Sequence, residues 1–497
     1  MKVFEQYILT PLRNTFRKHT KRKAFYINGI YYTYSQFAER VSAIRMAINA
    51  AQSNDMVFAL AFHNDIDSYA SIFALWMEGK AYVPLHPNQP LERNLNIIAQ
   101  VGLHNVLDSR GQSAFVNQNV HVITTSQCAY TADYIDDWAD TKEDDLAYIL
   151  FTSGSTGVPK GVPLSRKNLA AFVKAFWDLG YDLDENDRFL QCFDLTFDLS
   201  VMSYLVPLLC GACIYTIPYD EVKYFAIAKS MMQNQLTFAL MTPSTIQYLR
   251  PYFEELEFPT MRYSLFCGEA LHTDMAMEWS KCLPNAEIDN VYGPTEDTIF
   301  CTAYRLHRNG NNVDYNGILS IGTSMTSGKV IIVDDNKREV TPGEVGELCL
   351  SGDQLTQGYW RNPEKTAEAF WIAEDGTRYY NSGDLCFYGE GGNIIFVGRK
   401  DSQVKINGFR IEVSEIEFHA RQFLGDTQVL VLAYTNAEGT QSLAMFIESE
   451  EQNNKPLIEY LSSKMPSYMM PTMYIYVAKF PMNSSNKIDR SALKRII

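Results

Sequence analysis

The chain has 497 residues, enough for two to four packing units at about 100–200 residues per domain, which excludes a peptide or a small disulfide-stapled scaffold. Hydrophobic residues make up 46% and charged residues 20%, as in an ordinary folded protein rather than a disordered one. The 43 basic and 58 acidic residues leave a net charge of −15, which disfavours nucleic acid and anionic lipid as partners but not an anionic small ligand held in a cleft.

Nine cysteines are scattered along the chain, an odd number that fits reduced thiols in the cytoplasm better than a disulfide framework. The close pair Cys210 and Cys213 could suggest zinc or redox chemistry, but no second pair or histidine cluster lies near it, so we expect no metal there. The N-terminus lacks an apolar core of signal-peptide length, and the longest apolar runs are far shorter than the roughly 18 residues of a membrane span. We therefore expect a cytoplasmic protein without membrane insertion.

The first clear pattern along the chain is a strand–helix–strand unit. The apolar run Met56–Phe62 predicts a buried strand, and Ala81–Leu85 predicts a second one. Between them a helical stripe of apolar residues stops at Gly79; it consists of Tyr69, Ile72, Phe73, Trp76 and Met77. This alternation is typical of an α/β fold with a mostly parallel sheet covered by helices.

A second unit is predicted to start with a strand at 147–152, to pass through a loop rich in Gly, Ser and Thr, and to enter a helix that ends near Gly180. The apolar face of that helix carries Leu169, Phe172, Val173 and Phe176. Because the loop follows the carboxyl end of a strand, we expect it to lie where open α/β sheets bind ligands.

The loop Thr152–Gly161 combines three glycines, four hydroxyl side chains and Lys160. Glycines permit turns that aim backbone N–H groups inward, hydroxyls add donors and the lysine adds a positive charge, so the pattern favours phosphate binding. It is not a Walker motif, because Pro159 stands where Gly-Lys-Ser/Thr requires glycine. A flexible surface loop is the alternative, but it does not explain the position after a buried strand.

The last part of the chain looks separable from the rest. Gly391-Gly392 and the charged segment Gly398–Asp401 interrupt the pattern before a new series of short elements begins. We place a domain boundary at Asp401, which divides the chain into residues 1–400 and 401–497.

Several motifs resemble those of the adenylate-forming, AMP-binding enzymes, the superfamily of nonribosomal-peptide adenylation domains, acyl-CoA synthetases and firefly luciferase. Thr152–Gly161 is similar to the phosphate loop of that superfamily. Further segments resemble signatures of its amino-acid-activating branch, in the same order along the chain: Ala81–Leu85, Asn290–Glu296, Gly346–Gly352 with Gly358–Trp360, Ser382–Leu385, Gly398–Arg410 and Asn486–Arg490. The resemblance implies a large N-terminal domain of parallel-type sheets covered by helices and a small, mobile α+β lid that swings about Asp401.

The resemblance also implies an ATP site. Tyr292 would stack on adenine, whereas a tyrosine of the core is the structural alternative. Asp384 would accept hydrogen bonds from the two ribose hydroxyls, with Arg399 nearby, although an Asp after Ser-Gly is otherwise often a turn residue. Glu296 would hold Mg²⁺ against the phosphates, because this hard cation prefers carboxylate and phosphate oxygens. The other residues implied to bind ATP are Thr152, Ser153, Gly154, Ser155, Thr156, Gly157, Lys160, Gly268, Glu269, Ala270, Asn290, Val291, Gly293, Pro294, Thr295 and Lys487.

Lys487 corresponds to the catalytic lysine of the superfamily. Its position alone, in a polar segment near the C-terminus, would indicate a solvated tail. The resemblance implies that it bridges the substrate carboxylate and the α-phosphate and stabilises the charge that builds as the carboxylate oxygen attacks phosphorus. Asn486 replaces the usual glycine before this lysine, and Asn tolerates the same left-handed backbone better than most residues.

Asp198 corresponds to the acidic residue that pairs with the α-ammonium of an amino acid substrate. Asp194 lies four residues earlier, but Phe-Asp-Leu-Ser fits Asp198 better, and a turn or helix cap is the alternative for either residue. The other pocket positions that the resemblance indicates are mostly apolar, which favours a small uncharged side chain; they are Leu199, Met202, Leu240, Leu265, Cys267, Val291, Ile299 and Phe300. The pocket is most similar to that of D-alanine–carrier protein ligases, although the same residues could be core packing.

The resemblance implies a monomeric ligase that converts an amino acid, D-alanine in first place, and ATP into aminoacyl-AMP and pyrophosphate. The aminoacyl group would then pass to the phosphopantetheine thiol of a separate carrier protein. Three alternatives stay open: another small or apolar amino acid in peptide biosynthesis, an acyl-CoA synthetase, and a non-enzymatic nucleotide-sensing or scaffold protein.

Overall fold

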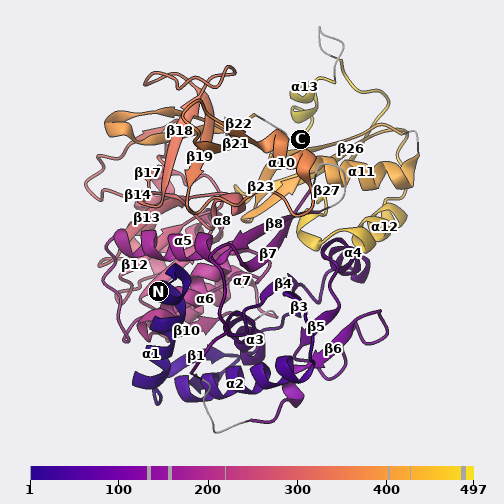
Figure 1. Cartoon of the computed structure of the whole chain (residues 1–497). Helices are drawn as coiled ribbons and strands as arrows, with labels where there is room; N and C mark the ends of the chain where they lie inside the picture. Colours follow the sequence, from indigo (N-terminus) through magenta and orange to yellow (C-terminus); the bar gives the residue numbers. More distant parts are fainter. Residues whose placement is uncertain are drawn as a thin grey trace.

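Strands and helices alternate along the chain and build three large sheets and a smaller C-terminal unit (Figure 1). The computed structural model describes residues 2–130, 136–154, 159–218, 220–400, 403–425, 427–482 and 488–497. The α/β fold class predicted from the sequence is confirmed. Within these ranges no helix has the length and apolar character that crossing a bilayer requires.

The first sheet has six strands in the order β6-β5-β3-β4-β7-β8. Its strands are β3 (Val57–Ala61), β4 (Ala81–Leu85), β5 (Asn105–Asp108), β6 (His121–Thr124), β7 (Leu146–Thr152) and β8 (Lys160–Ser165). Strands β3 and β4 run parallel and are joined by α3 (Ile66–Met77), so the predicted strand–helix–strand unit is confirmed. The neighbouring helices are α2 (Tyr34–Ala50) and α4 (Leu91–Val101).

The second predicted unit was wrong in one respect. The loop after β7 does not enter a helix directly, because β8 returns antiparallel to β7 before α5 (Arg166–Asp178) begins. The segment Lys160–Ser165 contains a proline, but its Val162 and Leu164 are fully buried against the sheet, which stabilises the hairpin. The hairpin therefore places the phosphate-loop candidate at its tip rather than at a strand-to-helix turn.

The second sheet has nine strands in the order β17-β14-β13-β12-β11-β9-β10-β1-β2. Its strands are β1 (Lys23–Ile27), β2 (Ile30–Thr33), β9 (Arg188–Gln191), β10 (Cys213–Thr216), β11 (Phe238–Met241), β12 (Tyr263–Phe266), β13 (Glu287–Tyr292), β14 (Thr302–Arg305) and β17 (Thr323–Ser324). The strands from β1 to β13 in this order run parallel, so their carboxyl ends share one edge. The associated helices are α1 (Thr10–Lys18), α6 (Asp198–Cys210), α7 (Lys223–Gln233), α8 (Pro243–Leu249) and α9 (Thr273–Cys282).

Helices α3 and α6 form the centre of the main core. Every residue of α3 is buried, and so is every residue of α6 except the last, Cys210. This is expected for helices that are apolar on all sides. The two helices meet through aromatic rings, Tyr69 and Phe73 of α3 against Tyr204 of α6. This packing holds the first residue of α6, Asp198, at a fixed place in the interior.

A third sheet follows, with β18 (Gly328–Val333), β19 (Gly346–Gly352), β20 (Phe370–Ile372), β21 (Arg378–Tyr388) and β22 (Ile394–Arg399). Its order is β18-β19-β21-β20, with β22 paired to β21, and all these pairs are antiparallel. Helix α10 (Pro363–Ala369) precedes β20, and the short strands β15 (Asp314–Tyr315) and β16 (Ile318–Leu319) form a separate hairpin.

The C-terminal unit, residues 403–497, has its own apolar clusters, whose members all lie between residues 404 and 493. It contains β23 (Gln403–Ile406), β24 (Phe409–Glu412), α11 (Val413–Leu424), β25 (Val429–Thr435), β26 (Gln441–Glu448), α12 (Lys455–Lys464), β27 (Met473–Val477) and α13 (Arg490–Lys494). In Figure 1 these yellow elements lie beside α4 and the hairpin β7–β8. Asp401 lies outside the described residues, so the hinge and the division there stay predictions.

Candidate active site

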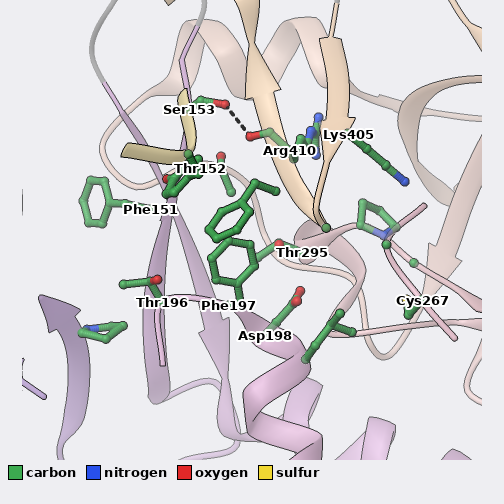
Figure 2. Close-up of a pocket in the computed structure, with 18 of the residues that line it drawn as sticks. Phe151, Thr152, Ser153, Thr196, Phe197, Asp198, Cys267, Thr295, Lys405 and Arg410 are labelled. Atoms are coloured by element: carbon green, nitrogen blue, oxygen red, sulfur yellow. Dashed lines mark hydrogen bonds between the residues drawn. The ribbon is translucent and has the colours of Figure 1, made fainter. Parts of the chain in front are cut away.

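The carboxyl ends of strands from the first two sheets and the hairpin β23–β24 surround one cavity of about 100 Å³ that opens to solvent (Figure 2). Phe151 and Thr152 at the end of β7 and Tyr292 at the end of β13 belong to its wall. The C-terminal unit closes one side with Lys405, Gly408, Phe409, Arg410 and Tyr468. The cavity thus lies at the sheet edge that the sequence indicates, but a segment far along the chain contributes to it as well.

The described part of the phosphate-loop candidate contacts the C-terminal unit directly. The Ser153 Oγ donates to the carbonyl of Arg410 at 2.9 Å and accepts from the N–H of Glu412 at 3.0 Å. The N–H of Gly154 donates to Glu415 Oε2 at 3.0 Å, and the other oxygen of Glu415 accepts from Arg93 at 2.7 Å. Three residues expected in this loop, Ser155, Thr156 and Gly157, lie outside the described residues.

Glu296 lies at the centre of a buried charged cluster. Its side chain is fully buried; Oε1 accepts from the Tyr359 hydroxyl at 2.8 Å, and Oε2 accepts from Arg410 at 2.9 Å. Lys160 Nζ lies 3.8 Å from the same carboxylate. Burial alone would raise the pKa of Glu296, but Arg410 and Lys160 outweigh it and hold the pKa at about 2. The carboxylate is therefore ionised at neutral pH.

The donor chemistry at Glu296 fits a magnesium ion. Mg²⁺ is ordinarily bound by one or two carboxylates together with substrate phosphates and water, and Glu296 offers one ionised carboxylate beside Lys160 and the phosphate-loop candidate. Within the ranges described above, no three His, Cys, Asp or Glu side chains gather into a metal-binding group of their own, so phosphate oxygens would have to complete the coordination.

A second cluster contains the residues expected to bind the nucleoside. The Tyr292 hydroxyl donates to Asp384 Oδ2 at 2.5 Å, and Arg399 donates to Asp384 Oδ1 at 2.7 Å. Asp384 and Tyr292 are both buried, and the ammonium of Lys405 lies 5.3 Å from the centre of the tyrosine ring. Two ribose hydroxyls would therefore meet a carboxylate that is already oriented by hydrogen bonds.

Several of the other residues expected to bind ATP line a neighbouring cavity. Glu269, Ala270, Asn290 and Tyr292 all belong to its wall, and Gly268 lines the main cavity. The Asn290 amide donates to the carbonyl of Ser320 at 2.9 Å. Glu269 accepts from the N–H of Ser244 at 2.8 Å and from the N–H of Gly408 at 2.9 Å, which joins this wall to the C-terminal unit.

Asp198 is a buried carboxylate with an unused acceptor. It is 8% exposed and lines the main cavity, and its Oδ2 has no hydrogen-bond partner. Burial raises the pKa of Asp198 to about 6, partly offset by a hydrogen bond from Thr295. Asp194, the other candidate, lies outside this wall with its Oδ1 3.6 Å from His86 Nε2. A cationic donor of the size of an ammonium group would supply what Asp198 lacks.

Few of the expected pocket positions face the main cavity. Two of them, Leu199 and Cys267, line it, together with Gly293, Pro294 and Thr295, which were expected to bind ATP. Figure 2 shows Asp198 and Cys267 on the same side of the opening. The remaining positions are buried in the core cluster that adjoins this wall: Met202, Leu240, Leu265, Val291, Ile299 and Phe300.

Sequence reasoning expected Lys487 of the C-terminal unit at the site but missed the hairpin β23–β24, which lines the cavity. Lys405, Phe409 and Arg410 belong to a quoted motif, but the face that a hairpin presents depends on how the unit docks, which no local pattern shows. The partners Arg93 and Glu415 are 322 residues apart in sequence. Lys487 lies outside the described residues.

A family model described as AMP-binding enzyme matches residues 12–360 of the chain. The chain therefore belongs to the AMP-binding enzyme family, and the resemblance inferred from its motifs is confirmed.

Three similar proteins illustrate the family. The D-alanine--D-alanyl carrier protein ligase of Bacillus velezensis is 30% identical over 446 residues, which cover 87% of each protein. Tyrocidine synthase 1 of Brevibacillus parabrevis is 29% identical over 457 residues, which cover 90% of this chain and 41% of that protein. The chain thus spans less than half of this relative, and less than a fifth of two other synthases that it matches. The structure of the Vibrio cholerae adenylation domain AlmE in complex with glycyl-adenosine-5'-phosphate has a TM-score of 0.86 at 26% identity and covers 98% of this chain and 97% of that one.

Proposed function

We propose that the protein activates an amino acid with ATP, forming aminoacyl-AMP and releasing pyrophosphate. The observation that carries this proposal is the buried acceptor of Asp198, which faces the same cavity as the end of the phosphate-loop candidate. A carboxylate there would bind the ammonium of an amino acid, which a fatty acid cannot offer, so it disfavours the acyl-CoA synthetase alternative.

In this reaction the substrate carboxylate oxygen forms a bond to the α-phosphorus, and the bond from that phosphorus to pyrophosphate breaks. Asp198 would fix the ammonium, Tyr292 and Asp384 the nucleoside, and the loop from Thr152 with Lys160 the phosphates. A magnesium ion held by Glu296 would neutralise phosphate charge. Lys487 would stabilise the negative charge shared between the carboxylate and the α-phosphate.

The second step we propose is transfer of the aminoacyl group to the phosphopantetheine thiol of a separate carrier protein. The thiol sulfur would bond to the aminoacyl carbon, AMP would leave, and the thiol would lose its proton. The D-alanine--D-alanyl carrier protein ligase, similar along most of both chains, supports this partner. We keep the cytoplasm as the proposed location and the monomer as the proposed state.

D-alanine is our first candidate substrate. Cys267 is 2% exposed and narrows the cavity beside Asp198, which favours a small side chain. Glycine is the second candidate, because the AlmE structure that is similar over the whole chain holds glycyl-adenosine-5'-phosphate.

ATP–pyrophosphate exchange with glycine, both enantiomers of the other amino acids and a set of fatty acids tests the proposal. We expect exchange with D-alanine or glycine and none with fatty acids. Exchange with fatty acids alone would establish the acyl-CoA synthetase alternative, and no exchange with any acid would refute the proposed function.

The exchange reaction should lose efficiency as the pH falls through about 6. Burial raises the pKa of Asp198 to about 6, and a protonated Asp198 cannot pair with an ammonium ion, so kcat/KM for the amino acid should drop about tenfold per pH unit below that point. A profile between about pH 5 and pH 8 checks this, with kcat/KM for ATP as the internal comparison. An amino acid profile that is flat across this interval would contradict the role given to Asp198.

Cys267→Ala should widen the side-chain pocket. We expect kcat/KM for an amino acid one carbon larger than the preferred substrate to rise about tenfold relative to that substrate, since one methylene group is worth about 1–3 kcal/mol in such pockets. Cys349→Ala, which alters a buried cysteine of β19 outside the cavity wall, is the matched control and should leave the ratio unchanged. An unaltered ratio in Cys267→Ala would show that Cys267 does not contact the side chain of the substrate.

A further inference from the structure

The loop that joins β13 to β14, residues 293–301, contains an unusual backbone turn. Thr298 has φ 51° and Ile299 has φ 78°, in the left-handed region that β-branched residues strongly avoid. The loop is also closely packed, because a Cβ placed on Gly293 would lie 2.4 Å from the Cα of Phe300. Such a turn persists only where surrounding contacts hold it.

One buried side chain supplies most of those contacts. Gln354, which follows β19 and is 1% exposed, has its amide nitrogen within hydrogen-bond distance of three carbonyls of the turn, which share its two hydrogens. The distances are 3.0 Å to Asp297, 3.2 Å to Thr298 and 3.0 Å to Phe300. The Thr298 hydroxyl donates to the main-chain carbonyl of Gln354 at 2.5 Å. The Ser327 hydroxyl donates to the side-chain oxygen of Gln354, Oε1.

The same loop carries groups of the candidate site. Its first half presents Gly293, Pro294 and Thr295 to the main cavity, where Thr295 lies beside Asp198. Glu296 follows immediately, and its main-chain carbonyl accepts from the N–H of Thr356 at 2.9 Å. A change in the turn at 297–300 would therefore move the neighbours of both Asp198 and Glu296.

We infer that Gln354 is a positioning residue, which holds the strained turn 297–300 so that Thr295 stays against Asp198 and the Glu296 carboxylate stays beside Lys160. The effect of Gln354 on catalysis rests on the proposed function, whereas its role in keeping the turn 297–300 in place does not. The inference assigns Gln354 no contact with substrate.

Gln354→Leu tests the inference, because leucine fills a similar volume without a donor. We expect faster hydrogen–deuterium exchange of the amides of residues 292–301, without any ligand present. In pyrophosphate exchange we expect about a tenfold rise in KM for the amino acid and a severalfold rise in the Mg²⁺ concentration for half-maximal rate. Asn105→Leu is the matched control: it removes the buried amide of β5, which bonds Ser53 and Asp55, and should lower the unfolding temperature without changing either constant.

A rescue separates positioning from general stability. Thr298→Gly lets residue 298 adopt the left-handed turn without a Cβ. Added to Gln354→Leu, it should therefore lower the raised KM for the amino acid at least threefold. If Gln354→Leu does not fold, Ser327→Ala is the second variant. It removes only the hydroxyl that orients the Gln354 amide and should shift the KM and the Mg²⁺ dependence in the same direction by a smaller amount.

Unchanged amide exchange in 292–301 would overturn the inference whatever the protein's activity. Altered amide exchange with unchanged KM and Mg²⁺ dependence would overturn the catalytic part alone, and a wild type inactive with every amino acid would refute the proposed function instead.

Discussion

Asp198→Asn is expected to reduce amino-acid-dependent pyrophosphate exchange by about two to three orders of magnitude and to make the protein more resistant to heat. Activity falls because the substrate ammonium would be buried without a negative partner, and breaking a buried ion pair costs about 3–5 kcal/mol. Stability rises because burial raises the pKa of Asp198 from 3.8 to about 6. The ionised carboxylate thus opposes folding at neutral pH by up to about 3 kcal/mol.

The sign of the stability effect depends on pH. An acid whose pKa is raised in the folded state stabilises the fold at low pH and loses that contribution as the pH rises through the folded pKa. The unfolding temperature of Asp198→Asn should therefore exceed that of the wild type by a few degrees at about pH 7.5, and the difference should shrink towards zero near pH 4.

Asp194→Asn is the matched control for this experiment. It makes the same chemical change four residues earlier, at a carboxylate that pairs with His86, and it should keep amino acid exchange within a few-fold of the wild type. Normal exchange in Asp198→Asn, or equal losses in the two variants, would show that the amino acid pocket lies elsewhere.

Lys487→Ala is expected to slow formation of aminoacyl-AMP by about two to three orders of magnitude, the usual effect of removing a group that stabilises transition-state charge. The expectation rests on the motif Asn486–Arg490. Transfer from chemically prepared aminoacyl-AMP to a carrier thiol should be nearly unchanged, because the lysine would act only while the bond to phosphorus forms.

Lys494→Ala controls for the loss of a positive charge near the C-terminus. Lys494 is exposed on α13, and its replacement should leave both half-reactions intact. Equal exchange rates for the wild type and Lys487→Ala would contradict the enzymatic proposal and favour a nucleotide-sensing or scaffold protein.

Local sequence patterns were sufficient to predict those helices and strands whose own residues carry a clear periodic signal. The apolar run before Gly79 predicted α3 and its flanking strands, because a helix buried on all sides and two buried parallel strands leave strong periodic signals. The hairpin β7–β8 was missed, because the antiparallel pairing of β8 with β7 is a tertiary contact.

Part of the candidate site could likewise be predicted from the sequence, and part of it could not. Motif order was sufficient to indicate Asp198, Tyr292 and Asp384, and the structure places all three on the wall of one cavity. The contacts of Glu296 with Arg410 and of Arg93 with Glu415 depend on how the C-terminal unit docks. No spacing within the sequence encodes that geometry.

The hydrogen bond from Gly154 to Glu415 has a consequence for the order of events under the proposed function. A phosphate oxygen bound there would compete with the Glu415 carboxylate for the same amide hydrogen, and a cation held by Glu296 would compete with Arg410. Occupancy by the triphosphate and this docking of α11 are therefore antagonistic, and each must weaken the other by an equal factor. The departure of pyrophosphate would thus remove this competition and let the C-terminal unit dock in the arrangement seen here.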